Sequence, residues 1–447
     1  MFITESRNST QAALSDVEYH FTTMKKQALL IFGIISAIPF FCALKADRRY
    51  PITEFGAIAD GITLNTKFIQ KAIDKCASDG GGIVLIPKGI FVSGSIFLKN
   101  DVDLILEKGA VLKGSINYED YPQIDTRWEG EEKKWIACLV NGIGLQGTKL
   151  SGEGTIDGSG DVWTQRGNQQ RQRQLAEAPT TPIRWQGRPR LIGFQNCRNI
   201  EISNVRLNNQ ASWGLFILYS KNVEVKNVKI TAEHNIPSSD GIDIDSSDGV
   251  HVTGCDIDVN DDCISIKAGK DEDGLRVNRP SQNILIEKTR FGYGHGGVAM
   301  GSETSGGIKN VMIKNCLFEA ENWAPVRFKS QPSRGGIVEN ITYKNLTLKG
   351  TRKAFEFNMA WRMVNPKKPA KVLPLVRNVR IINVSGTANS VGDMRGLPGS
   401  PIQGVLFKNC NITAKRGFLM EHATNVNLKG LKIRGVDGEP ITKNNVK

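Results

Sequence analysis

The feature that most constrains the fold of this chain is a short internal repeat. Its clearest copy, Asn199–Leu207, contains two short runs of alternating apolar residues separated by a polar residue. Other copies begin at Asn222, Gly249, Asn283, Asn310, Asn340, Asn378, Gly404 and Asn425, and successive copies start 21 to 38 residues apart. A copy of this length cannot bury its own apolar side, so neighbouring copies must stack on one another.

Repeats of this kind indicate an all-β solenoid. Alternation of apolar and polar residues is the pattern of a β-strand with one buried side. Two or three short strands in each copy, with no helical period between them, are typical of a right-handed parallel β-helix. The length of 447 residues would also fit two or three ordinary domains, but the continuous repeat predicts a single solenoid domain over residues 47–447.

The open N-terminal end of such a solenoid needs a cover. In the segment Thr66–Ala77 the apolar residues recur at helical spacing. This spacing predicts one amphipathic capping helix, with Asn65 or Thr66 as its N-cap and the glycines at 80–82 as its end.

The N-terminus has the organisation of a secretory signal. Lys25 and Lys26 precede an apolar run from Ala28 to Leu44, and a small residue follows at Ala46. Because the run is shorter than the roughly 20 apolar residues of a membrane span, residues 1–46 are interpreted as an N-terminal extension and signal peptide. A retained anchor is the alternative. Cleavage predicts an exported protein, periplasmic or secreted, with no stable membrane span in the mature chain.

The amino-acid composition limits the kinds of molecule that this chain is expected to bind. Lys and Arg number 58 against 45 Asp and Glu, which gives a formal net charge of +13. Such a charge favours a polyanion, which could be nucleic acid, an anionic membrane or an acidic polysaccharide. Eight cysteines in a chain of this length exclude a small disulfide scaffold. Cys255, Cys316 and Cys410 share one repeat position, which predicts stacked buried thiols rather than metal ligands.

One stretch departs from the repeat. Residues 158–190 contain several arginines and glutamines and few apolar residues. The stretch is longer than a normal connection, so it is either a functional loop or an inserted segment. Its arginines could contact an anionic polymer, and a solvated loop or a short exposed helix is the alternative.

Six chemically reactive side chains interrupt the plain rhythm of the repeats: Asp240, Asp261, Asp262, His295, Arg327 and Lys329. The steps from Asp240 to Asp261, His295 and Arg327 in turn are 21, 34 and 32 residues, each about one coil. Equivalent positions on successive coils of a parallel solenoid lie about 4.8 Å apart. We therefore expect the six side chains on one face, within a few coils.

Such a cluster suits hydrolysis of a glycosidic bond. One carboxylic acid protonates the leaving oxygen, and another carboxylate activates water or attacks carbon. Crowded carboxylates raise one another's pKa, and Arg or Lys can bind the carboxylate of an acidic sugar. Two other interpretations remain open at this point. One is a set of Asp-rich turns at the coil corners, and the other is a calcium site built from Asp240, Asp243, Asp245, Asp261 and Asp262.

Four motifs, in order, resemble those of glycoside hydrolase family 28, the polygalacturonases or pectin hydrolases. The family's Asn-Thr-Asp, Asp-Asp, Gly-His-Gly and Arg-x-Lys motifs are matched by Ser238–Asp240, Asp261–Asp262, Gly294–Gly296 and Arg327–Lys329. The resemblance covers the chain from about Tyr50 to the C-terminus. Any one motif is weak evidence, whereas four in order at coil spacing are specific.

The resemblance implies an inverting glycosidase in which Asp261 is the proton donor. Asp240 and Asp262 would activate the attacking water, and His295 would tune the acid and contact the substrate. Inverting sites leave about 6.5–9.5 Å between carboxyl groups to admit water, a separation that neighbouring coils are expected to provide. The family uses no metal and no other cofactor.

The same resemblance implies an acidic plant cell-wall polysaccharide, pectin or galacturonan, as the substrate. Arg327 and Lys329 would bind a galacturonate carboxylate beside the scissile bond. No nucleic-acid motif is present, and a monomer is expected. The long loops, including Gly269–Gly274, resemble those of bacterial exo-acting members, which release galacturonic acid from chain ends.

One departure and three alternatives accompany this prediction. Ser238 replaces the asparagine of the first motif, which removes an amide near the substrate and bears on the sugar preference. A rhamnogalacturonan-cleaving hydrolase of the same family is the main alternative, although the presence of His295 favours galacturonan. A calcium-dependent lyase would not need the Asp-Asp and Gly-His-Gly motifs. A non-catalytic polysaccharide-binding β-helix would not need the clustered acids.

Overall fold

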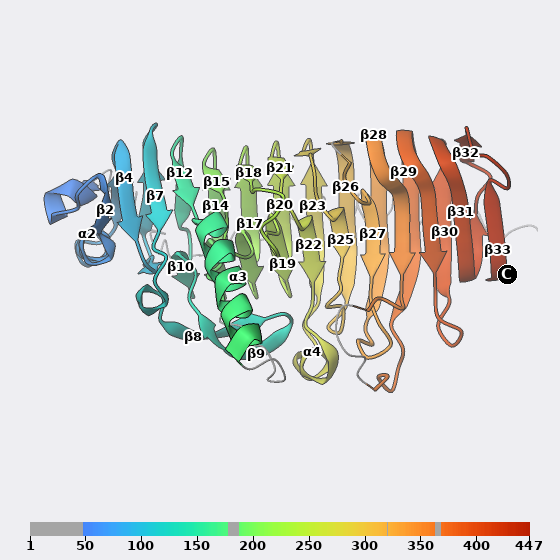
Figure 1. The fold of residues 1–447 in the computed structure, drawn as a ribbon, viewed down its shortest axis with the longest axis horizontal. Helices are drawn as coiled ribbons and strands as arrows, with labels where there is room; N and C mark the ends of the chain where they lie inside the picture. Colours follow the sequence, from blue (N-terminus) through green and yellow to red (C-terminus); the bar gives the residue numbers. More distant parts are fainter. Residues whose placement is uncertain (1–47, 178–186, 320, 363–367) are drawn as a thin grey trace, which may run out of the picture. The chain divides into compact units, whose positions relative to one another are not determined.

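The structure is a computed structural model that describes residues 48–177, 187–319, 321–362 and 368–447. In these residues one parallel sheet of 31 strands winds into coils, which Figure 1 shows following one another along the chain. The right-handed parallel β-helix predicted from the repeat is confirmed. The predicted signal segment, residues 1–46, lies outside the described residues.

The strands form three faces, each a ladder of parallel pairs. The first face consists of β1 (Arg49–Pro51), β3 (Gly82–Ile86), β6 (Val102–Leu106), β11 (Lys149–Gly152), β14 (Arg198–Ser203), β17 (Lys221–Lys226), β20 (Asp248–Thr253), β23 (Ser281–Glu287) and β30 (Ile402–Lys408). The second face consists of β2 (Asp60–Leu64), β4 (Gly89–Ser93), β7 (Ala110–Gly114), β12 (Thr155–Asp157), β15 (Arg206–Asn208), β18 (Lys229–Thr231), β21 (Asp256–Asp258), β24 (Arg290–Phe291) and β32 (Leu431–Arg434).

The third face carries most of the chemistry described below. It consists of β5 (Ile96–Phe97), β10 (Val140–Ile143), β13 (Ile192–Gln195), β16 (Leu215–Leu218), β19 (Ile242–Asp245), β22 (Asp262–Lys267), β25 (Gly296–Met300), β27 (Val326–Lys329) and β33 (Ile441–Val446). Four longer strands pass through more than one face: β26 (Ile308–Phe318), β28 (Ile337–Asn358), β29 (Leu375–Arg395) and β31 (Cys410–Asn427).

Left-handed corners explain why Asn or Gly begins each copy of the repeat. All of these first residues, from Asn199 to Asn425, have φ between 53° and 72°. Gly and Asn adopt this region more readily than other residues. The amides of neighbouring corners also bond: Asn340 Nδ2 donates to Asn310 Oδ1 at 3.2 Å, and Asn378 Nδ2 donates to Asn340 Oδ1 at 3.4 Å. The corners are thereby aligned from coil to coil.

The apolar residues of the repeat form the core inside the coils. Ile341 pairs in register with Val311 on one side and with Val379 on the other, and all three are buried. Aromatic rings stack in the same way, with 4.5 Å between the ring centroids of Phe328 and Phe357. Burial of apolar surface stabilises the folded state by about 25 cal/mol per Å². Because the coils are stacked in register, each coil buries equivalent side chains and adds a similar contribution.

The predicted capping helix is present as α2 (Thr66–Ser78). It buries Ile69, Ala72, Ile73 and Cys76 and contacts β1, β3, β5, β6 and the 3-10 helix η1 (Ile52–Phe55). Asn65 is the N-cap residue, as predicted, but its side chain makes no capping hydrogen bond to the helix. The Asn65 side chain instead bonds to the backbone of Ile58 and Thr63, which fixes the turn that leads into the helix.

Further segments leave the coils on the side where Figure 1 shows β8, β9 and α4. A 3-10 helix, η2 (Tyr118–Asp120), leads into an antiparallel hairpin of β8 (Gln123–Trp128) and β9 (Glu131–Ile136). The unusual stretch at 158–190 contains α3 (Gly160–Glu177), and its residues 178–186 lie outside the described part. A short helix, α4 (Asp271–Val277), follows β22. Within the described residues, no helix has both the length and the apolar character that crossing a membrane requires.

The three cysteines that share a repeat position are buried free thiols. The Sγ atoms of Cys255, Cys316 and Cys410 each lie 3.2–3.5 Å from the carbonyl oxygen two residues earlier. Burial raises the pKa of Cys255 to about 11 and that of Cys316 to about 12. The prediction of buried thiols is confirmed, but they do not stack on one another, because Cys316 pairs with Leu346 and Cys410 with Leu431 on the neighbouring coils.

Asn340 offers a test of the corners. The variant N340A removes two amide contacts and forces alanine into the left-handed region, which costs about 1–2 kcal/mol. The variant N340G loses the same contacts but adopts that region freely. We expect N340A to lower the free energy of unfolding in urea by about 1–3 kcal/mol and N340G to lower it by less. Equal losses in the two variants would contradict a conformational role for the corner.

Candidate active site

The reactive side chains singled out from the sequence lie on four neighbouring strands of the third face. Asp240 lies just before β19, Asp261 just before β22 and His295 just before β25; Asp262 begins β22, and Arg327 and Lys329 lie on β27. These strands pair in the order β19, β22, β25 and β27. The structure therefore brings all six side chains to one face.

Coil stacking sets the positions of the three carboxylates. The backbone N–H of His295 donates to the Asp261 carbonyl at 3.0 Å, and that of Gly241 donates to the Asp262 carbonyl at 3.0 Å. Asp261 and His295 thus occupy equivalent positions on neighbouring coils, and so do Asp240 and Asp262. Each of the three aspartates has a carboxylate oxygen within 4.8 Å of the others.

Asp262 is fully buried and is held by two cations. One of its oxygens accepts from Arg327 Nη1 at 3.0 Å, and the other accepts from Lys329 Nζ. Arg327 also donates to Glu356 at 2.7 Å, and its guanidinium lies 4.9 Å from the centre of the Trp361 ring. Charge-assisted bonds of this kind are short and strong, so Asp262, Arg327 and Lys329 form one fixed unit.

Asp240 and Asp261 have opposite environments. Burial, together with the charges of Asp243 and Asp261, raises the pKa of Asp240 well above its usual range. Burial would also raise the pKa of Asp261, but the hydrogen bond with His295 and the charge of Lys329 outweigh it and lower that pKa. The His295 Nδ1 atom lies 3.4 Å from Asp261 Oδ1. In the free site Asp240 therefore keeps its proton to a higher pH than Asp261 does.

The three carboxylates also differ in their exposure to solvent. The Asp261 side chain is 25% exposed, whereas Asp240 and Asp262 are buried. The His295 side chain beside Asp261 is 47% exposed. Asp261 and His295 are therefore the parts of the cluster that a polymer in solution meets first.

A second group of charges adjoins the cluster, of which the sequence analysis considered only Asp243, as a calcium ligand. Lys267 Nζ lies 3.5 Å from Asp243 and 3.2 Å from Glu303, and all three side chains are buried. Burial raises the pKa of Asp243 to about 8; the Lys267 charge opposes this shift, and the charges of Asp262 and Glu303 add to it.

The five carboxylates considered for calcium do not form one calcium site. Asp245 is bound to Arg127 of β8 at 2.7 Å, with both side chains fully buried. Asp243 faces Lys267, and Asp262 holds two cations of its own. Three of the five therefore face side-chain cations of the protein, and the five do not converge on one site.

The β8–β9 hairpin lies across the third face and is fixed there by its tip. Lys270 N–H donates to the Gly130 carbonyl at 2.9 Å. The Glu132 carboxylate accepts from Tyr219 Oη at 2.7 Å and from Arg276 Nη2 at 2.6 Å. Because Tyr219 follows β16 and Arg276 belongs to α4, Glu132 ties the hairpin to two separate parts of the solenoid.

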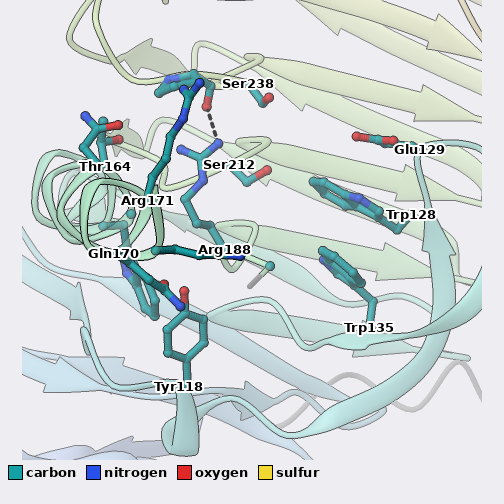
Figure 2. Close-up of a pocket in the computed structure, with 16 residues that line it drawn as sticks. Tyr118, Trp128, Glu129, Trp135, Thr164, Gln170, Arg171, Arg188, Ser212 and Ser238 are labelled. Carbon is teal, nitrogen blue, oxygen red and sulfur yellow. Dashed lines mark hydrogen bonds between the residues drawn. The ribbon is translucent and has the colours of Figure 1, made fainter. Parts of the chain in front are cut away.

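A cavity of about 530 Å³ lies between this hairpin, α3 and the loops before β16 and β19 (Figure 2). Trp135 stacks on Trp128 with 4.7 Å between ring centroids, and Trp128 stacks on Trp213 at 4.9 Å. The Trp213 ring lies 4.8 Å from Lys267 Nζ. Ser238 lines the cavity, two residues ahead of the first aspartate of the cluster. The cavity therefore adjoins the carboxylates.

This arrangement can perform general acid–base chemistry on an anionic substrate. It combines a buried carboxyl that retains a proton, a carboxylate that meets solvent, and a third carboxylate held by Arg and Lys. Their separation leaves each within reach of a shared water. The cations beside them can pair with a substrate carboxylate.

Sequence comparisons relate the chain to known enzymes. Residues 76–437 match the family model described as glycosyl hydrolases family 28. An exo-poly-alpha-D-galacturonosidase of Dickeya chrysanthemi is 32% identical over 337 residues, covering 68% of this chain and 55% of that protein. A protein of Vitis vinifera named as a probable polygalacturonase is 29% identical over 392 residues, covering 85% of this chain and 77% of that protein.

The fold has a solved counterpart of similar extent. The exopolygalacturonase of Thermotoga maritima superimposes with a TM-score of 0.72 and 26% sequence identity. The match covers 89% of this chain and 92% of that one. The likeness therefore extends over most of the solenoid, including the strands that carry the carboxylates.

The pH dependence of stability tests the buried carboxyl of Asp243. Its pKa of about 8 in the folded protein lies above the value of about 3.9 for an unfolded aspartate. The stabilising proton is present below about pH 4, and its contribution is lost as the pH rises toward 8. We expect the Tm of D243N, which stays neutral, to rise relative to that of the unmodified protein between about pH 5 and pH 9.

The matched control for that experiment is D125N, which changes a carboxylate that is 84% exposed on the hairpin. Its Tm difference from the unmodified protein should stay flat over the same pH range. A flat difference for D243N as well would contradict a buried, protonated Asp243.

Proposed function

This chain belongs to the glycosyl hydrolases of family 28, and we propose that it hydrolyses the α-1,4 bonds of polygalacturonate with inversion, releasing galacturonic acid from a chain end. The observation that carries the proposal is the cluster of three aspartates beside Arg327 and Lys329. Pectin, an acidic plant cell-wall polysaccharide, contains such chains. The cations of the site and the net charge of +13 both favour an acidic polymer.

Asp261 serves as the general acid in this proposal. It is the carboxylate that meets solvent, so it can approach a glycosidic oxygen from the groove. Asp240 and Asp262 orient the attacking water from the buried side. His295 contacts the substrate and adjusts Asp261, while Arg327 and Lys329 pair with a galacturonate carboxylate next to the scissile bond.

The proton must reach Asp261 after the substrate binds. In the free site the pKa of Asp261 is lowered by His295 and Lys329 against the opposing effect of burial. A galacturonate carboxylate that pairs with these cations weakens their pull on Asp261, so its pKa rises. Asp240 is within 4.8 Å and has a raised pKa. It can therefore supply the proton through one bridging water.

One oxygen of each of the three aspartates lies within 4.8 Å of the others, whereas the expected distance of about 6.5–9.5 Å is a separation between whole carboxyl groups. Inverting sites with two carboxylates need the wider gap to admit water. Here a third carboxylate is present, so that Asp240 and Asp262 can hold the water while Asp261 donates the proton. Inversion is further supported because Asp262 is buried and clamped by two cations, which leaves it poorly suited to attack carbon.

Action at chain ends is supported by the hairpin. Its strands cover the third face beside the cluster, and its tip bonds to Lys270. Any side chain at Gly130 would collide with Lys270 and Glu303, so the tip packs closely against the coils. A polymer lying along the groove would meet this barrier, whereas a chain end could enter the cavity next to it.

The cellular setting follows from the substrate. Because pectin is extracellular, the enzyme is exported, and we propose residues 1–46 as the signal that directs export to the periplasm or the medium. Residues 47–447 would then be the catalytic unit, acting as a monomer. Rhamnogalacturonan is a less favoured substrate, because His295 completes the galacturonan-type motif.

Product analysis on polygalacturonic acid tests the proposal. We expect saturated galacturonic acid from the earliest time points, with the viscosity falling slowly and no effect of EDTA. An unsaturated, calcium-dependent product would instead identify a lyase. The absence of any product would overturn the proposed substrate and favour rhamnogalacturonan fragments.

The variant D261N tests the general acid. Asparagine keeps the shape but cannot supply a proton, and general acids contribute about 10²- to 10⁴-fold to rate. We expect kcat on polygalacturonate to fall by at least about 10²-fold, while affinity for the polymer, measured by calorimetry, is retained. A loss of less than tenfold would contradict the role of Asp261.

The variant E132A tests the hairpin as a barrier. It removes the carboxylate that accepts from Tyr219 and Arg276, which frees the tip to move. We expect a faster fall in viscosity for each reducing end released, because mid-chain bonds become accessible. K134A is the control, since Lys134 is 70% exposed on the same hairpin and pairs with the exposed Asp125. Identical product profiles for E132A and K134A would contradict the barrier.

A further inference from the structure

The cavity beside the hairpin contains an unusual number of unsatisfied polar atoms. Five of its lining residues have a buried side-chain nitrogen or oxygen atom that meets no hydrogen-bond partner among the residues that the structure describes. These atoms are Trp135 Nε1, Trp163 Nε1, Thr164 Oγ1, Arg188 Nη1 and Ser212 Oγ. Buried polar groups in native proteins nearly always have partners. Their concentration around one cavity indicates that a bound molecule or water completes them.

The chemistry of these atoms specifies the partner. Indole and guanidinium nitrogens only donate hydrogen bonds, so Trp135, Trp163 and Arg188 each require an acceptor. The hydroxyls of Thr164 and Ser212 can donate or accept. A ligand that fits must therefore be rich in acceptors. A sugar carboxylate supplies acceptor oxygens without donors. The hydroxyls of a sugar ring can exchange hydrogen bonds with the hydroxyls of Thr164 and Ser212.

Arg188 is the charged member of this set. Its Nη2 atom donates to the Pro237 carbonyl at 2.8 Å, a bond drawn as a dashed line in Figure 2. Within the described residues no carboxylate forms an ion pair with Arg188, and burial lowers the pKa of its guanidinium, with Tyr118 opposing. The Arg188 side chain is partly exposed, but its Nη1 atom is shielded from water, and a shielded guanidinium nitrogen without an acceptor is costly.

The backbone places Arg188 against the tryptophan wall. Any side chain at Gly187 would collide with the ring of Trp135, so glycine is required for the chain to pass this close. Trp135 and Trp128 stack with an interplanar angle of 10°. Figure 2 shows the two rings on one side of the cavity and Arg188 nearer to α3. A flat apolar wall opposite a charged donor is a combination that fits a pyranose ring bearing an acid group.

Two elements of the cavity wall also lead toward the carboxylate cluster. Pro237, which Arg188 holds, is three residues before Asp240 in the same loop. The tryptophan stack extends to Trp213, whose ring lies 4.8 Å from Lys267. A chain whose end occupies the cavity would thus have its next bonds near the aspartates.

We propose that this cavity binds the terminal uronic acid of the polymer, with Arg188 as the partner of its carboxylate and Trp128 and Trp135 as the wall against its ring. The inference rests on the proposed function and deepens it, because it names the group that selects an acidic chain end. Arg188 is thus a specificity-determining residue outside the four sequence motifs.

The test compares two substrates that differ at one carboxylate. One is a short oligogalacturonide, and the other is the same oligomer with its terminal carboxylate reduced to an alcohol. We expect the unmodified enzyme to prefer the acidic end by about tenfold to hundredfold in kcat/KM, the range for a charge-assisted bond. In R188Q we expect the ratio to fall close to one. Because a ratio is measured, partial loss of folded protein does not affect it.

The matched control is R173Q, which removes one positive charge from the exposed Arg173 of α3, a residue that does not line the cavity. It should keep the full preference. A preference retained in R188Q, or lost equally in R173Q, would overturn the assignment of Arg188.

A binding measurement separates this inference from the proposed hydrolysis. Calorimetry with galacturonic acid and with galactose, which lacks the carboxylate, needs no turnover. We expect the unmodified protein and R173Q to bind the acid more tightly than the neutral sugar, and R188Q to lose that difference. Binding with this pattern but without hydrolysis of polygalacturonate would refute the proposed activity alone. Hydrolysis with equal binding in R188Q and R173Q would refute the inference alone.

Discussion

The structure depends on one constraint, the parallel stacking of coils in register at about 4.8 Å. A left-handed Asn or Gly at the start of each copy fixes the corner, and bonds between amides such as those of Asn310 and Asn340 align successive corners. Register then converts sequence distance into spatial proximity. Residues tens of positions apart, such as Asp261 and His295, become neighbours because they occupy equivalent positions on adjacent coils. A loss of register by one coil would disperse the site without changing its residues.

The electrostatics of the site follow from how closely the coils place like charges. Three aspartates within 4.8 Å cannot all ionise at low cost, and the protein resolves this by giving each a different surrounding. Two cations hold Asp262, His295 lies against Asp261, and Asp240 is buried with its proton. The nearby Lys267, with Asp243 and Glu303, extends the same balance of charge beyond the cluster. The division of roles among identical side chains is therefore a property of their environments.

The sequence predicted what repeats and short motifs can encode. Alternation and spacing gave the solenoid, the capping helix α2 and the face on which six reactive residues meet. The β8–β9 hairpin and the cavity could not be predicted, because their positions depend on contacts between distant segments. An exposed helix was one of the alternatives for residues 158–190, where α3 lies. Glu132 accepts hydrogen bonds from Tyr219 and Arg276, and Arg188 donates one to Pro237. No local sequence pattern predicts these partners. Asp243 was noticed only as a calcium ligand, since its burial beside Lys267 is visible only once the strands are paired.

The central claim is that the stacked aspartates direct a water molecule onto the sugar while a proton is delivered to the leaving oxygen. The most direct measurement is proton NMR of the first product released from an oligogalacturonide, recorded before the anomers equilibrate. Direct attack by water predicts the β-anomer from an α-linked substrate. An initial α-anomer would show that a carboxylate attacks carbon and forms a covalent intermediate, and it would contradict the roles assigned to Asp240 and Asp262.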